Sequence, residues 1–330
     1  MRIAVARETR PGETRVALVP DLVGRLLALG YDVVFEPGAG RAAGHSDEAY
    51  IAAGARLGSL DGATLVLSVH PVATSATSVS LTPGSTFVLE RVPRLTRAQP
   101  MDALTSQALV AGYRAVVVAA DLLGRIFPLT VTAAGTLPPA RVLVLGAGVA
   151  GLEAIATSHR LGGRVSAYDV RASSAEEIRS LGAEPIDLEL PPLEGATGYA
   201  REMTPDRAAL QQERLLPHLA AMDVVITTAA VPGRHPPILV TRAMLEVMPP
   251  GSVVIDVYAD LGGNVEGSVA GEVVTVGGTR VWGGDNVPGQ LPGPASRLYA
   301  QNVVSFVELL TRNGRFDPDY DDEIVSACVT

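Results

Sequence analysis

Short apolar runs alternate with amphipathic stretches of helical length along this chain. In the first third, the short runs predict β-strands and the amphipathic stretches predict helices. The predicted strands are 2–6, 32–36, 64–69 and 86–90, and the predicted helices are 20–29 and 48–53. Residues 78–83 combine Ser, Thr and Pro, and predict a turn-rich link.

The alternation resumes after 102–123, a long apolar segment without proline that predicts a helix. Further strands are predicted at 141–145, 164–168, 224–227, 253–257 and 273–276, and further helices at 152–161 and 295–310. This order is typical of an α/β fold, and we expect two Rossmann-like domains with a cleft between them, joined by long crossing helices. Residues 1–125 with 295–330 are expected to form a catalytic or substrate-type domain, and 126–294 a nucleotide-binding domain.

A glycine-rich turn follows the predicted strand at 141–145. Gly146, Gly148 and Gly151 have G-x-G-x-x-G spacing, and Asp169 ends the next predicted strand about 20 residues later. The glycines allow a tight turn, a close approach to a pyrophosphate and close helix packing, and the helix N-terminus favours phosphate. Asp169 can accept hydrogen bonds from both ribose hydroxyls and would repel a 2′-phosphate. The sequence therefore predicts a site for NAD(H) rather than NADP(H).

Composition narrows the class of protein. The net charge of −9 argues against nucleic acid as a partner. The single cysteine, Cys328, excludes an internal disulfide and a cysteine-based zinc cluster, and we predict no metal site. No apolar run is expected to span a bilayer, and the N-terminal residues predict a strand rather than a secretory signal, so we expect a cytoplasmic protein.

The chain contains no lysine, so Schiff-base chemistry and lysine acid–base catalysis are excluded. A second glycine cluster, Gly38-Ala39-Gly40 with Gly44, also follows a predicted strand. Its spacing differs from that of a phosphate loop, and it continues into polar residues rather than a helix. We interpret it as a turn.

Longer strings of residues surround these features. They are 7–9 with 13–20, 93–102 with 112–115, 132–141, 169–171, 198–203, 231–234, 262–264 and 325–330. Together they resemble the alanine dehydrogenase/transhydrogenase superfamily, and within it the NAD(H)-binding component of proton-translocating NAD(P) transhydrogenase. The resemblance covers most of the chain.

The resemblance implies which residues bind the cofactor. Arg94, Gln99 and Asp102 match a loop beside the nicotinamide, and Thr105 takes the place of a family serine. Tyr199 matches a loop that closes over nucleotide, with a plain surface loop as the alternative. The full set of expected cofactor-binding residues is Gly146, Gly148, Val149, Ala150, Gly151, Asp169, Val170, Arg171, Thr105, Tyr199, Thr228, Ala229, Asn264 and Asn286.

The chain also departs from the family. Residues 72–82 replace a longer segment that in relatives contains a helix and a strand, and in alanine dehydrogenases carries the catalytic histidine. The catalytic lysine of those enzymes would fall at Ser68. Arg15 matches an arginine that holds a substrate carboxylate, with an ion pair as an equal alternative. Asp260 matches an acid of the dehydrogenases.

Three functions stay open at this point. The first is a subunit that passes hydride between NADH and NADP held on a partner, with Arg94, Gln99 and Asp102 at the nicotinamide. The second is a stand-alone NAD-dependent dehydrogenase of a small carboxylate or amino acid, with Arg15 on the carboxylate and Asp260 or His70 handling the proton. The third is a non-catalytic NAD(H)-sensing protein.

We favour the first function. It implies NAD(H) as cofactor, a homodimer, and NADP(H)-binding and membrane transhydrogenase components as partners. The protein would then lie in the cytoplasm or at the inner face of the plasma membrane.

Overall fold

Two compact units make up the computed structural model, which describes residues 1–193, 195, 201, 203–230 and 234–330. The first unit comprises Met1–Val110 and Pro288–Thr330, and the second comprises Ala111–Val287. The chain thus enters the first unit twice, with the second unit between the two passages.

A six-stranded parallel sheet forms the centre of the first unit. Its strand order is β3-β2-β1-β4-β5-β6, the order of a Rossmann-like sheet. The strands are β1 (Arg2–Val5), β2 (Asp32–Phe35), β3 (Arg56–Leu57), β4 (Leu65–Leu67), β5 (Thr77–Ser80) and β6 (Phe87–Val88).

Alternate side chains of these strands enter different cores. Ile3 and Val5 of β1 pack with helices α1 (Pro20–Ala28) and α8 (Pro292–Leu309), whereas Ala4 faces a smaller core closed by loop residues. This follows from the two-residue period of a strand. Helices α2 (Asp47–Ala52) and α9 (Glu323–Cys328) complete the large core, and a short hairpin of β16 (Thr311–Arg312) and β17 (Arg315–Phe316) follows α8.

Strand β5 is where the sequence prediction of a turn-rich link is wrong. Residues Thr77–Ser80 pair in parallel with β4 and β6, so the shortened segment of this chain still supplies a strand. Its inward residues are small and polar rather than apolar. Ser78 accepts a hydrogen bond from the Thr86 amide (3.1 Å), and Ser80 donates to the Thr82 carbonyl (2.7 Å). Because these hydroxyls are satisfied locally, the strand is buried without an apolar pattern.

The second unit contains a seven-stranded sheet in the order β11-β10-β9-β12-β13-β15-β14, with β14 antiparallel at the edge. Its strands are β9 (Arg141–Leu145), β10 (Arg164–Tyr168), β11 (Glu184–Pro185), β12 (Val224–Thr227), β13 (Val253–Asp256), β14 (Val273–Val276) and β15 (Thr279–Gly283). The mixed α/β architecture with parallel sheets confirms the predicted fold class.

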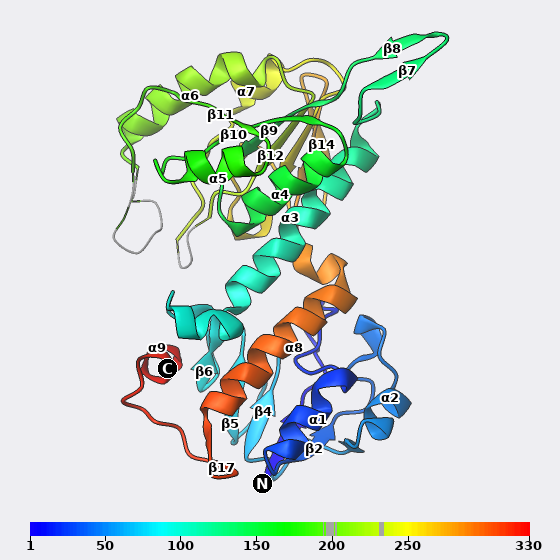
Figure 1. Cartoon of the computed structure of the whole chain (residues 1–330), viewed down its shortest axis with the longest axis vertical. Helices are drawn as coiled ribbons and strands as arrows, with labels where there is room; N and C mark the ends of the chain where they lie inside the picture. The colour runs from blue at the N-terminus through cyan, green and yellow to red at the C-terminus, as the bar shows by residue number, and fades with distance from the viewer. Residues whose placement is uncertain (194, 196–200, 202, 231–233) are drawn as a thin grey trace. The chain divides into compact units, whose positions relative to one another are not determined.

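Helices cover both faces of this sheet (Figure 1). Val142 and Val144 of β9 pack with α4 (Val149–Arg160), α5 (Ser174–Ser180) and the second half of α3 (Ala103–Leu122). Leu143 and Leu145 pack on the opposite face with α6 (Pro205–Leu219) and α7 (Arg242–Glu246).

Helix α3 belongs to both units, which changes the expected boundaries. Ala103 lies in the core of the first unit, whereas Ala115 and Ala119 lie in a core of the second. The compact units therefore divide inside α3, rather than after residue 125. All of α8 belongs to the first unit, so the second division lies before it, at 287–288.

Among the described helices, α3 alone is long and apolar enough to cross a membrane, although the sequence analysis expected no such segment. Its most apolar 18-residue window has a mean hydropathy of 1.3, and half of that window is buried within the protein. Core helices of water-soluble domains share these properties, so α3 is weak evidence for a span.

An antiparallel hairpin of β7 (Thr130–Thr132) and β8 (Gly135–Leu137) extends from the second unit (Figure 1). Its apolar side chains are exposed: 59% for Leu129, 72% for Val131 and 52% for Leu137. An isolated two-stranded hairpin with exposed apolar residues is marginally stable in water. These residues are called the hairpin patch below.

Candidate functional site

The glycine turn of the second unit has the geometry of a dinucleotide-binding turn. Gly146 has a φ of +102°, which L side chains rarely adopt. A Cβ on Gly151 would lie 1.8 Å from the Gly146 carbonyl oxygen, so only glycine allows α4 to begin this close to the strand. Gly148 is the N-cap of α4, and a Cβ there would meet nothing within 4 Å. The turn therefore offers open backbone at a helix N-terminus.

This arrangement fits the diphosphate of a dinucleotide. The first amide groups of α4, beginning at Val149 and Ala150, have no carbonyl partner within the helix, and the helix dipole is positive at this end. Helix α3 packs directly behind, because a Cβ on Gly112 would lie 2.2 Å from the Ala150 carbonyl oxygen. The position of the cofactor helix thus depends on a glycine of α3.

Asp169 follows β10 and folds back onto the same turn. Its Oδ2 accepts a hydrogen bond from the Ala147 amide (2.7 Å), and its Oδ1 accepts from the Arg171 amide and Nε, each at 2.9 Å. Arg171 Nη2 also donates to the Ala147 carbonyl (3.1 Å). The acid and the arginine are largely buried, with side chains 9% and 17% exposed. A positive guanidinium therefore lies beside the carboxylate expected at the ribose, and Val170 stands between the two residues.

Thr228 and Ala229 follow β12 and lie against the glycine turn. Thr228 Oγ1 donates to the Gly146 carbonyl (2.9 Å). Asn264 is fully buried, accepts from the Ala229 amide (3.1 Å) and donates to the Ala229 carbonyl (2.8 Å). Asn264 therefore fixes the backbone of Ala229, and its side-chain amide is engaged by the protein itself.

The carboxyl group of Asp256 fixes Asn264 in turn, and sequence reasoning missed it. It accepts hydrogen bonds from the amides of Asn264 (3.0 Å) and Val265 (3.2 Å). Burial raises the pKa of Asp256, and these hydrogen bonds only partly offset the shift. The signal in the sequence was an acid ending a fully apolar strand, Val253–Asp256.

Asp260 and Asn286 also lie together in the second unit. The Asn286 amide donates to Asp260 Oδ2 (3.2 Å), and Asn286 has a φ of +40°. Asp260 is exposed on a short 3₁₀ turn, Ala259–Leu261. The pair is a surface feature of the second unit, distinct from the residues around Gly146.

The expected nicotinamide loop belongs to the first unit. Gln99 lies in a 3₁₀ turn, Thr96–Met101, and both it and Arg94 are exposed. Asp102 precedes α3 and accepts hydrogen bonds from the Thr105 amide (2.9 Å) and hydroxyl (2.6 Å). This is an N-cap contact, so Asp102 and Thr105 order the start of α3.

Asn302 of α8 holds this loop from below by donating to the Pro100 carbonyl (2.8 Å). Asn302 is only 7% exposed, and the sequence reasoning did not single it out. Nothing in the local pattern of α8 distinguishes this asparagine from a core polar residue.

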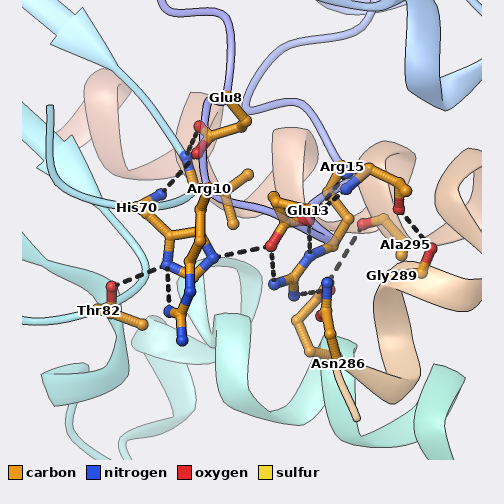
Figure 2. A network of polar contacts seen from close by, with 12 residues as sticks. Glu8, Arg10, Glu13, Arg15, His70, Thr82, Asn286, Gly289 and Ala295 are labelled. Carbon is orange, nitrogen blue, oxygen red and sulfur yellow. Dashed lines mark hydrogen bonds and ion pairs between the residues drawn. The ribbon is translucent and has the colours of Figure 1, made fainter. Parts of the chain in front are cut away.

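Arg15 lies in a buried polar network of the first unit, which Figure 2 shows. Its Nε and Nη2 donate to the two oxygens of Glu13 at 2.8 and 2.7 Å, and its Nη1 donates to Gln107 Oε1 at 2.9 Å. His70 Nε2 lies 2.8 Å from Glu13 Oε2 on the other side. The guanidinium is therefore bound by residues of the protein, as in the ion-pair alternative of the sequence analysis.

Opposite pKa shifts occur within this network. Burial would raise the pKa of Glu13, but hydrogen bonds from Arg15 and His70 outweigh it and hold that pKa well below its usual range. Burial raises the pKa of Glu8, and hydrogen bonds from the amides of Val69 and His70 only partly offset it. Glu13 is thus the firmly ionised member of the network.

His70, rather than Ser68, is the residue of this strand end that reaches Glu13. The Ser68 hydroxyl is buried and makes no hydrogen bond among the described residues. Position 68 therefore supplies no group to the network in place of the expected lysine.

The second glycine cluster forms a turn. The Gly38 amide donates to the Asp47 carboxylate (2.9 Å), and only a three-residue 3₁₀ turn, Arg41–Ala43, follows. An amide engaged by an acid is unavailable to phosphate. Tyr199, the expected nucleotide-closing residue, lies outside the described residues.

Family comparisons cover both units. The family described as "Alanine dehydrogenase/PNT, C-terminal domain" matches residues 115–330, and "Alanine dehydrogenase/PNT, N-terminal domain" matches residues 4–88.

Named relatives match over nearly the whole chain. An NAD(P) transhydrogenase subunit alpha chain of Rhodospirillum rubrum is 40% identical, with 93% of this chain and 89% of the relative covered. The corresponding chain of Rickettsia prowazekii is 38% identical, with 98% and 93% covered.

Solved structures agree. A transhydrogenase from Sinorhizobium meliloti matches with a TM-score of 0.88 and 41% identity, covering 100% of this chain and 98% of that one. An L-alanine dehydrogenase matches with a TM-score of 0.76 and 26% identity, over 95% and 91% of the two chains. The chain therefore belongs to the alanine dehydrogenase/PNT family.

Proposed function

We propose that this protein is the NAD(H)-binding subunit of a transhydrogenase and passes hydride between NADH and NADP held on a partner component. The observation that carries the proposal is the full-length likeness to transhydrogenase alpha subunits at about 40% identity, against 26% for the alanine dehydrogenase structure. The glycine turn with Asp169 supplies the matching nucleotide site.

Bound NADH supplies the hydride, and the protein supplies position and selectivity. The amides at the start of α4 hold the diphosphate, and Asp169 accepts hydrogen bonds from the adenine ribose. Arg94 and Gln99 orient the nicotinamide end, while Asp102 and Thr105 hold their loop through the N-cap of α3. Transfer between two nicotinamides needs no acid or base, which suits a chain without lysine.

The roles of Arg15 and Asp260 differ between the candidate functions. In a transhydrogenase subunit, the Glu13–Arg15 pair stabilises the first unit and Asp260 supports the Asn286 turn. A dehydrogenase of a small carboxylate is the second candidate, and the observation that favours it is the His70–Glu13 contact beside Arg15. In that case Arg15 has to exchange Glu13 for the substrate.

We also propose that the protein is a homodimer and works at the membrane through its partner components. The hairpin patch supports self-association, because it exposes apolar side chains on an element that gains little stability alone. The names of the relatives support the membrane and NADP(H)-binding partners.

Reconstitution tests the function. The protein is mixed with a purified NADP(H)-binding transhydrogenase component, and hydride transfer is followed with a nicotinamide analogue of distinct absorbance. We expect turnover only with both components, and no partner-free oxidation of NADH by pyruvate or other 2-oxo acids. Partner-free turnover that Arg15→Ala abolishes would establish the dehydrogenase instead.

Variants of the nicotinamide loop refine the same assay. Arg94→Ala and Gln99→Ala should slow hydride transfer by about tenfold or more with little loss of NADH affinity, because both act at the reacting end. Arg91→Ala is the control, since that side chain donates to the Val329 carbonyl elsewhere in the first unit. Unchanged transfer in both loop variants would remove the assignment.

A further inference from the structure

A second cavity opens at the edge of the second unit's sheet opposite the glycine turn. It has a volume of about 390 Å³ and lies where β9, β12 and β13 begin, whereas Gly146 lies where β9 ends. Its charged lining consists of Arg125, Arg141, Arg280 and Asp223. Three positive groups therefore share the cavity with one negative group, and the nucleotide site does not use any of them.

Asp223 organises two of the arginines. It is buried, with a side chain 8% exposed, and accepts from Arg125 Nη1 at 2.8 Å and from Arg141 Nε at 3.3 Å. Its Oδ2 also accepts from the Arg141 amide (2.8 Å), so the carboxylate is fixed to the start of β9. Arg125 donates a further hydrogen bond to the Pro138 carbonyl (3.0 Å). Two guanidinium groups are thus held in place before any ligand arrives.

Arg280 has a different environment. It is half-buried in β15, and its guanidinium makes no hydrogen bond or ion pair within the described ranges of the chain. Its Nη2 lies 4.0 Å from the position of a Cβ on Gly124, the residue before Arg125. A partly desolvated cation beside two ordered ones is unfavourable unless an anion joins them. The cavity contains the space for that anion.

We propose that this cavity binds a multivalent phosphate-type oxyanion, such as inorganic phosphate, pyrophosphate or the terminal phosphates of a nucleotide. Arg280 supplies the uncompensated charge, and Arg125 and Arg141 supply oriented N–H donors. Arginine suits this task because its planar donors match tetrahedral oxyanions. The site is separate from the cofactor's diphosphate site, since the two lie at opposite ends of the same parallel strands.

Calorimetric titration of the full chain with pyrophosphate, in saturating NADH, tests the proposal. NADH fills the diphosphate site at Gly146, so binding there is already blocked. We expect saturable binding near one per chain, weakened at least about tenfold by Arg280→Gln, because a charge-assisted contact is lost. Arg179→Gln is the matched control: an exposed arginine of α5 in the same unit and outside the cavity. It should change affinity less than about twofold, and NADH binding should be normal in both variants.

Several outcomes would overturn the site. They are no saturable binding to the wild type, equal weakening by Arg179→Gln, and unchanged binding in Arg280→Gln. Loss of pyrophosphate binding on adding NADH would assign it to the cofactor site instead. Tighter binding of citrate than of pyrophosphate would overturn the phosphate chemistry, and orthophosphate in a parallel titration shows whether one phosphate group suffices.

Discussion

Asp169 and Arg171 set the charge at the adenine ribose between them. The carboxylate repels a 2′-phosphate, but the guanidinium 2.9 Å away offsets some of that repulsion. The preference for NAD(H) should therefore depend on both residues, in opposite directions.

Substitution of each residue separates these effects. Asp169→Ala should weaken NADH binding by about tenfold, since hydrogen bonds to charged groups contribute about 1.5–3 kcal/mol, and should narrow the difference from NADPH. Arg171→Ala should weaken NADPH binding further than NADH binding. Calorimetric titration of both nucleotides measures this, and tighter NADPH binding by Arg171→Ala would contradict it.

Glu13 binds both Arg15 and His70 inside the first unit. Glu13→Gln leaves Arg15 buried without its carboxylate and should lower the free energy of unfolding by about 3 kcal/mol or more at pH 7. Because the folded pKa of Glu13 is lowered, its contribution is present above the unfolded value near 4.5 and is lost as pH falls through and below that value.

Urea unfolding at pH 7 and pH 4 checks both statements. The difference between wild type and Glu13→Gln should shrink as pH falls. Asp317→Asn, an exposed acid of the same unit, is the control and should alter stability little at either pH. A difference that grows toward low pH would refute the assignment of the ionised state.

At the level of elements, two helical glycines have opposite surroundings. A Cβ on Gly24 of α1 meets nothing within 4 Å, whereas a Cβ on Gly112 of α3 meets the Ala150 backbone at 2.2 Å. Ala is favoured over Gly in a helix by about 1 kcal/mol, so space alone decides the outcome.

Gly24→Ala should raise the free energy of unfolding by about 0.5–1 kcal/mol. Gly112→Ala should lower it by about 1–3 kcal/mol through overpacking, and should also weaken NADH binding because α4 has to shift. Thermal unfolding with and without NADH measures both changes. Equal gains in the two variants would mean that α3 and α4 separate without cost.

The elements also show what the sequence could predict. The strand–glycine–helix unit at 141–161 and the acid at 169 were predicted correctly, because apolar periodicity and glycine spacing are local signals. Strand β5 was missed because Ser78 and Ser80 are buried by hydroxyl contacts rather than by apolarity. The contacts of Asn264, Gln107 and Asn302 join positions far apart in the chain, so no local pattern announces them.

At the scale of the whole molecule, the hairpin patch bears on assembly. Val131→Glu places a charge on its most exposed apolar residue, and should convert a dimer into a monomer while leaving the fold intact. Analytical ultracentrifugation measures the mass of both forms. Val273→Glu, an exposed position of edge strand β14, is the control. A wild-type monomer, or a dimer that survives Val131→Glu, would contradict the proposed role of the hairpin.

The division of the chain between its units also has a consequence for biosynthesis. The second unit is one continuous stretch, Ala111–Val287, and its core residues all emerge from the ribosome before α8 does. The first unit lacks Tyr299, Val303 and Phe306 of α8 until the last residues are made, although its sheet is synthesised first. Domains usually fold in the order of synthesis. Here the later unit can finish first, and the N-terminal sheet has to wait, with one apolar face uncovered, for the end of its own chain.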